Sequence, residues 1–131
     1  ADIDDIVTVA MSRGIAALII SNTTISRPAL ASLYAGETGG LSGAPLRDMA
    51  QQRLVDFRKA SGGQIGLIGV GGIASAQDAY ARIRAGASLV QIYSALVYQG
   101  PGLARRINKQ LQQLLQADGF VNISDAVGDD G

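Results

Sequence analysis

Two turns along this chain carry residues that suit the binding of an anion. Gly69-Val70-Gly71-Gly72 ends one apolar run, and Tyr93-Ser94 ends the run that begins at Ser88. A glycine lets the backbone approach an anion without a clash from Cβ, and a helix that starts near Ser75 would add the positive end of its dipole. The first turn alone would also suit an ordinary tight turn. Paired at neighbouring strand ends, the two turns predict a phosphate-binding site, because such ends converge on an anion in parallel α/β folds.

A further cluster of polar side chains follows the apolar run 15–20. Ser21-Asn22-Thr23-Thr24 places four hydrogen-bonding side chains in succession. Such side chains could contact a ligand, but they are also common in turns and at helix caps. This segment alone leaves both interpretations open. A connection of about twenty residues follows instead of a helix, and loops of that length are often functional. The connection closes with Gly39-Gly40-Leu41-Ser42-Gly43-Ala44-Pro45, which suits close approach to a flat ligand but also has the composition of a plain flexible loop.

The periodicity of apolar residues predicts the elements that position these turns. Helices are expected over 3–13, 46–60, 75–85 and 101–118, with glycines at or near their ends, and a short helix after Asn122 or Ser124 in the tail 120–131. Ser75 is a candidate N-cap, with Asp78 three residues later. Strands are expected over 15–21, 64–70 and 88–93.

The order of these elements indicates an α/β fold. Each strand is a continuous apolar run, which predicts a parallel sheet buried on both faces. A Rossmann fold is not favoured, because the glycines at 69–72 do not follow the G-x-G-x-x-G spacing. Three strands form either a small open sheet or part of a larger barrel. A helix precedes the first strand and the sequence opens at Ala1 without Met, which favours the C-terminal part of a (β/α)8 TIM barrel, with three parallel strands and about four helices in residues 1–131 and the N-terminal half absent.

The composition excludes several kinds of chemistry within these residues. Lys and Arg number 11, as do Asp and Glu, so the overall charge gives no attraction to nucleic acid or to an anionic membrane. The chain has no Cys and no His, which removes thiol and imidazole chemistry, and we expect no metal site. Asp2, Asp4 and Asp5 suit the start of a helix better than a metal site. The apolar run 15–20 is too short to span a bilayer, and the N-terminus has no signal pattern.

Four motifs in this order resemble dihydroorotate dehydrogenase, and the resemblance covers nearly the whole chain. The motifs are Ser21-Asn22-Thr23-Thr24, Gly39-Gly40-Leu41-Ser42-Gly43-Ala44-Pro45-Leu46, Ile68-Gly69-Val70-Gly71-Gly72-Ile73, and Ala85-Gly86-Ala87-Ser88-Leu89-Val90-Gln91-Ile92-Tyr93-Ser94. Together with the last of them, Val97-Tyr98-Gln99-Gly100-Pro101 is most similar to the quinone-linked, membrane-associated class 2 enzymes.

The resemblance implies a role for seven residues. Asn22 and Thr23 match the pair that hydrogen-bonds the ring of orotate or dihydroorotate, a role that suits an amide and a hydroxyl. Ser21 matches a position that contacts the flavin, and Gly43 matches the loop glycine that lets the backbone approach FMN. Three residues match the site of the FMN phosphate: Gly72, Tyr93 and Ser94.

The activity implied by the resemblance is the FMN-dependent oxidation of (S)-dihydroorotate to orotate in pyrimidine (UMP) biosynthesis, with ubiquinone as electron acceptor. The catalytic base, a Ser in class 2 enzymes, would lie upstream, so no residue here is assigned as catalytic. The family's N-terminal helices would make the only membrane contact, which places the enzyme at the cytoplasmic side of the inner membrane. The chain by itself is expected to be inactive and to self-associate or remain loosely packed, because its strand edges and helix faces lack partners.

Two alternatives remain at this point. One is another FMN- or phosphate-binding barrel oxidoreductase, such as a class 1 dihydroorotate dehydrogenase, because phosphate sites of this kind are shared among barrels. The other is a non-catalytic, truncated half-barrel. A Cys as the catalytic base would decide for class 1.

Overall fold

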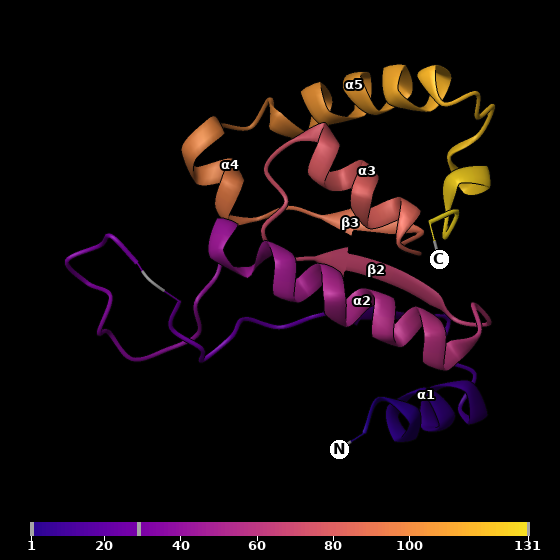
Figure 1. The fold of residues 1–131 in the computed structure, drawn as a ribbon, viewed down its shortest axis with the longest axis horizontal. Coiled ribbons are helices and arrows are strands. Elements are labelled where there is room, and N and C mark those ends of the chain that lie inside the picture. Colours follow the sequence, from indigo (N-terminus) through magenta and orange to yellow (C-terminus); the bar gives the residue numbers. More distant parts are fainter. Residues whose placement is uncertain (1, 29, 131) are drawn as a thin grey trace.

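A computed structural model describes residues 2–28 and 30–130 of the chain (Figure 1). Ala1, Ala29 and Gly131 lie outside the described residues, so the last position of the predicted tail does too. The elements, in chain order, are α1 (Ile3–Ser12), β1 (Ala17–Ile20), the 3-10 turn η1 (Ala44–Leu46), α2 (Arg47–Ser61), β2 (Gly66–Val70), α3 (Ala76–Arg84), β3 (Leu89–Gln91), α4 (Ser94–Gln99), α5 (Leu103–Ala117) and the 3-10 turn η2 (Ile123–Ala126).

The three strands form one parallel sheet in the order β1-β2-β3. Ile19 pairs with Ile68, and Ile68 pairs with Leu89, so the register places these three residues in one row across the sheet. Helix α2 connects the first two strands and α3 connects the last two (Figure 1). The predicted parallel α/β architecture with three strands is confirmed.

The core lies between the sheet and its helices. Leu67 of β2 and Leu54 of α2 are almost completely buried in one apolar cluster with Phe57. A second cluster joins α3 to α5 through Ile83 and Ile107. Helix α1 packs on α2, and the two clusters meet at the strand β3, where Val90 contacts both. Burial of these side chains, at about 25 cal/mol per Å² of apolar surface, is the main contribution to stability.

The opposite face of the sheet is exposed, and the prediction of burial on both faces is wrong for the described residues. Ile19 is 56% exposed and Leu89 is 63% exposed, while burial alternates along β2. A parallel strand becomes buried on both faces only where a second layer covers it, and here α2 and α3 both pack on the same side. The row Ile19, Ile68 and Leu89 is called the open sheet face below.

Several predicted element boundaries need correction around the third strand. The strand ends at Gln91 instead of continuing to Tyr93, and the helix α4 occupies 94–99, which the apolar pattern did not predict. The last helix begins at Leu103, so Pro101 precedes the helix and is not its first residue. The sequence of α4 is apolar at most positions, and its short length made it indistinguishable from a strand end.

Helix ends follow the local signals in the sequence. The Ser75 Oγ accepts a hydrogen bond from the backbone N–H of Asp78 at 3.1 Å, which confirms the predicted N-cap. The Asp78 carboxylate accepts from the N–H of Ala74 and not from that of Ser75, so the reciprocal bond is displaced by one residue. Asn122 and Asp125 form a complete capping box at η2, where the short helix of the tail was predicted.

The connection between β1 and η1 projects away from the body (Figure 1). Thr24 and Leu41 pair as an isolated antiparallel bridge at its base, with N–H···O distances of 3.2 and 2.7 Å. The Arg27 guanidinium crosses the loop and donates to the carbonyl oxygens of Glu37 and Gly39 at 3.0 and 2.6 Å. These contacts give the long loop a defined base beside the carboxyl ends of the strands.

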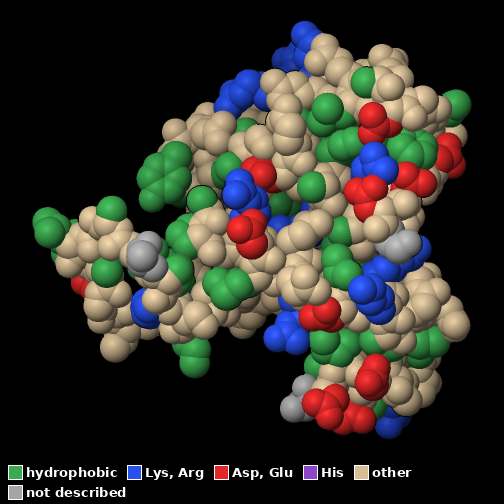
Figure 2. All heavy atoms as spheres, in the orientation of Figure 1, with side chains coloured by type: hydrophobic (Ala, Val, Ile, Leu, Met, Phe, Trp, Pro, Cys, Tyr) green, Lys and Arg blue, Asp and Glu red, His purple; other side chains and the backbone are tan. Residues whose placement is uncertain are grey.

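The surface carries no face of a single charge in the view of Figure 2, where basic and acidic side chains are interspersed over most of the body. Acidic side chains gather at the end where α1 begins, which has Asp4 and Asp5 in its first turn. That placement suits the positive end of the helix dipole, as the sequence predicted.

Candidate functional site

A cavity of about 370 Å³ lies at the carboxyl ends of the strands. It is bounded by the segment after β1, the end of the long loop, the turn after β2 and the start of α4. All seven residues that the sequence singled out for cofactor or substrate contact line it: Ser21, Asn22, Thr23, Gly43, Gly72, Tyr93 and Ser94. The topology thus brings residues from distant parts of the chain to one cavity, since Ser21 and Ser94 both line it.

The turn after β2 requires glycine for conformation and for space. Gly71 and Gly72 have φ of +105° and +72°, a region that side chains with a Cβ rarely adopt. A Cβ on Gly72 would lie 2.5 Å from the Cα of Arg47, at the start of α2. The glycine therefore serves close packing of the turn on α2, in addition to the approach of an anion that the sequence suggests.

The same turn offers backbone donors to the cavity. Among residues 2–28 and 30–130, the N–H groups of Gly71 and Gly72 have no hydrogen-bond acceptor within the protein. Both residues line the cavity. Successive free N–H groups in a glycine turn form a concavity that suits a phosphate, so this turn fits the phosphate group that the sequence predicted.

The N-terminus of α3 contributes less to an anion site than the sequence suggests. The Asp78 carboxylate occupies this end and accepts from the N–H of Ala74 at 3.1 Å, while Ser75 caps the N–H of Asp78. A carboxylate at a helix N-terminus neutralises part of the positive dipole end. At this turn, the N–H groups of Gly71 and Gly72 therefore remain as donors for an anion.

The last strand and the long loop form the facing wall. The hydroxyl groups of Ser42 and Ser94 lie 3.0 Å apart, and a Cβ on Gly43 would lie 3.7 Å from that of Ser94. Gly43 therefore needs to be glycine for its φ of +81° and not for space. Tyr93 also lines the cavity, although the residue is 79% exposed, and it is the N-cap of α4. Sequence reasoning missed Ser42 as a side-chain partner of the site.

The polar segment after β1 lies at the opening of the cavity. Asn22 and Thr23 are exposed, and Ser21 is half-buried. The Asn22 Oδ1 accepts a hydrogen bond from the N–H of Thr23 at 2.8 Å, which holds the amide group beside its own backbone. The Thr23 hydroxyl also donates to this oxygen at 3.5 Å, so the amide nitrogen of Asn22 remains as a donor and the hydroxyl oxygen of Thr23 as an acceptor for a planar ligand with carbonyl and N–H groups.

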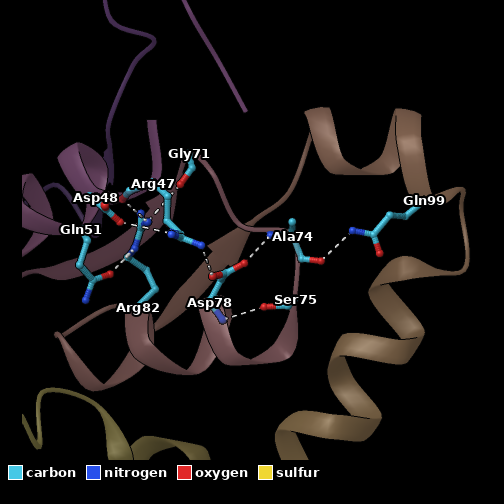
Figure 3. Close-up of polar contacts among 9 residues, drawn as sticks. All are labelled: Arg47, Asp48, Gln51, Gly71, Ala74, Ser75, Asp78, Arg82 and Gln99. Atoms are coloured by element: carbon cyan, nitrogen blue, oxygen red, sulfur yellow. Dashed lines mark hydrogen bonds and ion pairs between the residues drawn. The ribbon is translucent and has the colours of Figure 1, made fainter. Parts of the chain in front are cut away.

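A buried arginine behind the glycine turn was not found by sequence reasoning (Figure 3). Arg82 of α3 is 1% exposed, and its guanidinium donates to backbone carbonyl oxygens of Val70 and Gly71 at 3.2 and 3.0 Å. Burial lowers the pKa of Arg82 from its usual value, and the nearby Asp78 carboxylate opposes that shift. One signal was available: a glycine inside a strand often marks a close approach, and a Cβ on Gly69 would collide with the Arg82 side chain.

Gln99 ties α4 to the same turn. Its amide nitrogen donates to the carbonyl oxygen of Ala74 at 2.9 Å (Figure 3). Arg82 of α3 and Gln99 of α4 thus both hold the turn. The turn also lines the cavity.

Neither a metal cluster nor a membrane-spanning helix occurs in the part of the chain that the structure describes. No group of three or more His, Cys, Asp or Glu side chains there could hold a metal ion. None of the described helices combines the length and the apolar character needed to cross a membrane.

Known proteins share the sequence pattern and the fold of this chain. Residues 1–115 match the family described as dihydroorotate dehydrogenase. The chain belongs to the dihydroorotate dehydrogenase family. It is similar to the protein named dihydroorotate dehydrogenase (quinone) of Novosphingobium aromaticivorans, with 64% identity over 128 residues, which are 98% of this chain and 37% of that protein. The protein of the same name from Rhodospirillum rubrum is 57% identical over 130 residues, which are 98% of this chain and 35% of that relative.

Solved structures of the family share the fold. The ligand-free DHODH of Eimeria tenella matches with a TM-score of 0.94 at 46% identity, over 98% of this chain and 36% of that one. The same enzyme in complex with ferulenol matches with a TM-score of 0.93, over 98% of this chain and 34% of that one. The chain thus spans about a third of the length of the dihydroorotate dehydrogenases it matches. Its parallel sheet and flanking helices are consistent with part of a (β/α)8 barrel.

Proposed function

We propose that this chain forms the flavin-phosphate and substrate-contacting part of a quinone-linked dihydroorotate dehydrogenase. The activity is the oxidation of (S)-dihydroorotate to orotate in pyrimidine biosynthesis, with FMN as cofactor and ubiquinone as electron acceptor. Family membership supports the reaction, and the relatives named dihydroorotate dehydrogenase (quinone) support the choice of acceptor over a class 1 enzyme.

One observation carries the cofactor proposal. Gly72, Tyr93 and Ser94, from the ends of two neighbouring strands, line a single cavity in which the N–H groups of Gly71 and Gly72 have no acceptor among the described residues. Backbone N–H groups and a serine hydroxyl are suitable donors for the oxygens of the FMN phosphate. Gly43, on the facing loop, gives the flavin close access to the backbone, and Ser21 contacts it from the end of β1.

Substrate contact is proposed for the segment after β1. The Asn22 amide and the Thr23 hydroxyl lie at the opening of the cavity and would hold the ring of dihydroorotate or orotate through its carbonyl and N–H groups. Bound FMN would accept a hydride from the substrate. The residues of this chain bind and orient the two molecules, and none is assigned as the base that removes the proton.

The proposed location follows from the acceptor. A quinone-linked enzyme works at the membrane in which its quinone is dissolved, so we propose attachment at the cytoplasmic side of the inner membrane. The contact with the membrane is proposed for the N-terminal helices that the resemblance to class 2 enzymes implies.

Titration of the protein with FMN tests the cofactor proposal, and quenching of flavin fluorescence measures the binding. The Gly72→Asp variant places a side chain against Arg47 and a negative charge beside the phosphate, so it should lose saturable binding. Gly36→Asp is the matched control, because Gly36 lies in the projecting loop, has no positive φ, and would place a Cβ in open space with no atom within 4 Å. Far-UV circular dichroism checks that both variants fold. Equal binding by Gly72→Asp and the parent chain would contradict a phosphate site at this turn.

A further inference from the structure

The Arg82 side chain makes an unusual set of contacts for a buried arginine. Its Nε donates to the Gln51 Oε1 at 2.7 Å, and its Nη1 donates to the Val70 carbonyl at 3.2 Å. Its Nη2 donates to the carbonyls of Gly71 and Arg47 at 3.0 and 3.2 Å. One guanidinium therefore links the turn after β2 to the first residue of α2 (Figure 3).

No carboxylate among the described residues pairs with this charge within 4.0 Å. Asp78 is the carboxylate whose charge acts on the pKa of Arg82, but its Oδ1 lies 3.5 Å from the Nη1 of Arg47 and pairs with that residue instead. A buried cation that is met only by uncharged oxygens is costly for stability. An apolar side chain in this position would avoid that cost, which indicates that the guanidinium has a task beyond filling the core.

The planarity of the peptide bond shows what that task is. In a trans peptide, the carbonyl of one residue and the N–H of the next point in opposite directions. Arg82 attracts the carbonyls of Val70 and Gly71, so the N–H groups of Gly71 and Gly72 point away from it. Arg82 does not line the cavity, whereas both glycines do, and the N–H groups of Gly71 and Gly72 have no acceptor among the described residues.

We propose that Arg82 is a positioning residue for the FMN phosphate: it holds two successive peptide groups with their N–H bonds directed into the cavity, and its buried charge adds positive potential behind them. This inference rests on the proposed function. Arg82 does not touch the phosphate and acts through the backbone of Gly71 and Gly72.

Gly69 of β2 leaves room for the Arg82 side chain. A Cβ at this position would overlap the Cγ of Arg82 and lie 3.0 Å from its Cδ. The absence of a Cβ at Gly69 thus leaves the space that the aliphatic part of the Arg82 side chain occupies on its way to the turn. Gly69→Ala should displace the guanidinium while leaving its charge in the protein.

Comparing FMN with riboflavin separates a phosphate effect from general damage, because riboflavin lacks only the phosphate. In Arg82→Met, which keeps the length of the stem, we expect FMN affinity to fall about tenfold or more and riboflavin affinity to stay within about twofold. Arg82→Lys retains the charge without the planar fork and should recover part of the FMN affinity. Arg105→Met removes an exposed arginine of α5 and is the matched control.

A second measurement does not depend on flavin. Residual dipolar couplings of the Gly71 and Gly72 N–H bonds, recorded on weakly aligned protein, report the direction of these bonds. They should change in Arg82→Met and in Gly69→Ala, and remain unchanged in Arg105→Met.

The outcomes distinguish the two proposals. Unchanged couplings in Arg82→Met, or equal losses of FMN and riboflavin affinity, would overturn the positioning role and leave Arg82 a structural residue. If the parent chain binds neither flavin, the proposed cofactor site fails for this chain, and the couplings alone still decide whether Arg82 directs the two N–H groups.

Discussion

The side-chain hydroxyls of Ser42 and Ser94 lie 3.0 Å apart, although the two residues are 52 positions apart in the chain. The contact joins the end of the long loop to the first residue of α4 at the edge of the cavity. It closes the wall opposite the glycine turn, and it brings Gly43 against Ser94.

A double-mutant cycle should detect this contact. Ser42→Ala and Ser94→Ala are each expected to lower the free energy of unfolding, with a coupling of roughly 0.5–1 kcal/mol, because the bond is exposed and exchanges with water. Urea unfolding of the two single variants and the double variant measures the coupling. Ser88→Ala serves as the control, since Ser88 is exposed and its hydroxyl has no partner among the described residues. Strict additivity would show that the two hydroxyls do not interact in solution.

Gly72→Ala is expected to destabilise the protein by about 1–3 kcal/mol, since a Cβ would meet the backbone of Arg47 and the φ of +72° disfavours alanine. The midpoint of urea unfolding measures the effect. Gly36→Ala, in open space, should leave the midpoint unchanged or slightly raised. A midpoint for Gly72→Ala equal to that of the parent would contradict the close packing of this turn on α2.

Stability should fall at alkaline pH because of Tyr80. Burial raises the pKa of Tyr80, and its hydroxyl donates to the Asp118 carboxylate at 2.7 Å, which raises the pKa further. Above the ordinary tyrosine pKa of about 10, the unfolded chain loses this proton first, so the folded state binds more protons and the free energy of unfolding decreases as pH rises. The contribution is complete below that pH and is lost as pH rises through the pKa of the folded state.

Chemical unfolding at a series of pH values from about 8 upward, by about one pH unit a step, tests this expectation. Tyr80→Phe should be less stable than the parent near neutral pH and show a shallower alkaline decline. Tyr34→Phe, which alters an exposed tyrosine of the long loop, should follow the parent curve. Parallel curves for Tyr80→Phe and the parent would contradict the role of this proton.

The open sheet face predicts self-association of the chain in isolation. Ile19, Ile68 and Leu89 form an apolar row, and two of them are more than half exposed. Exposed apolar surface of this kind favours association. Leu89→Glu should shift the protein toward monomer in sedimentation velocity, whereas Leu33→Glu, on the projecting loop, should not. A monomer at all concentrations with a sharp, concentration-independent thermal transition would contradict this prediction.

Local signals in the sequence predicted most of the elements, but not α4, and several of the residues that line the cavity. Ser75, Gly62 and Asn122 begin or end helices as their types indicate, because capping depends on a few neighbouring backbone groups. The alternation of elements alone places the motifs at 21–24, 71–72 and 93–94 at strand ends. Parallel strands align their carboxyl ends, so those residues had to meet.

Only the tertiary structure decided which contacts hold that site together. Arg82 and Arg84 are indistinguishable in the sequence of α3. In the structure, Arg82 is buried against backbone carbonyls, whereas Arg84 pairs with the side-chain carboxylates of Asp118 and Asp130. The exposure of Ile19 also depends on which side of the sheet the helices cover, and apolar character alone does not contain that information. Capping arises from interactions between near neighbours in the chain, whereas the pairing of the strands, the burial of a charge and the covering of a sheet face depend on segments that are distant in sequence and meet only in the folded protein.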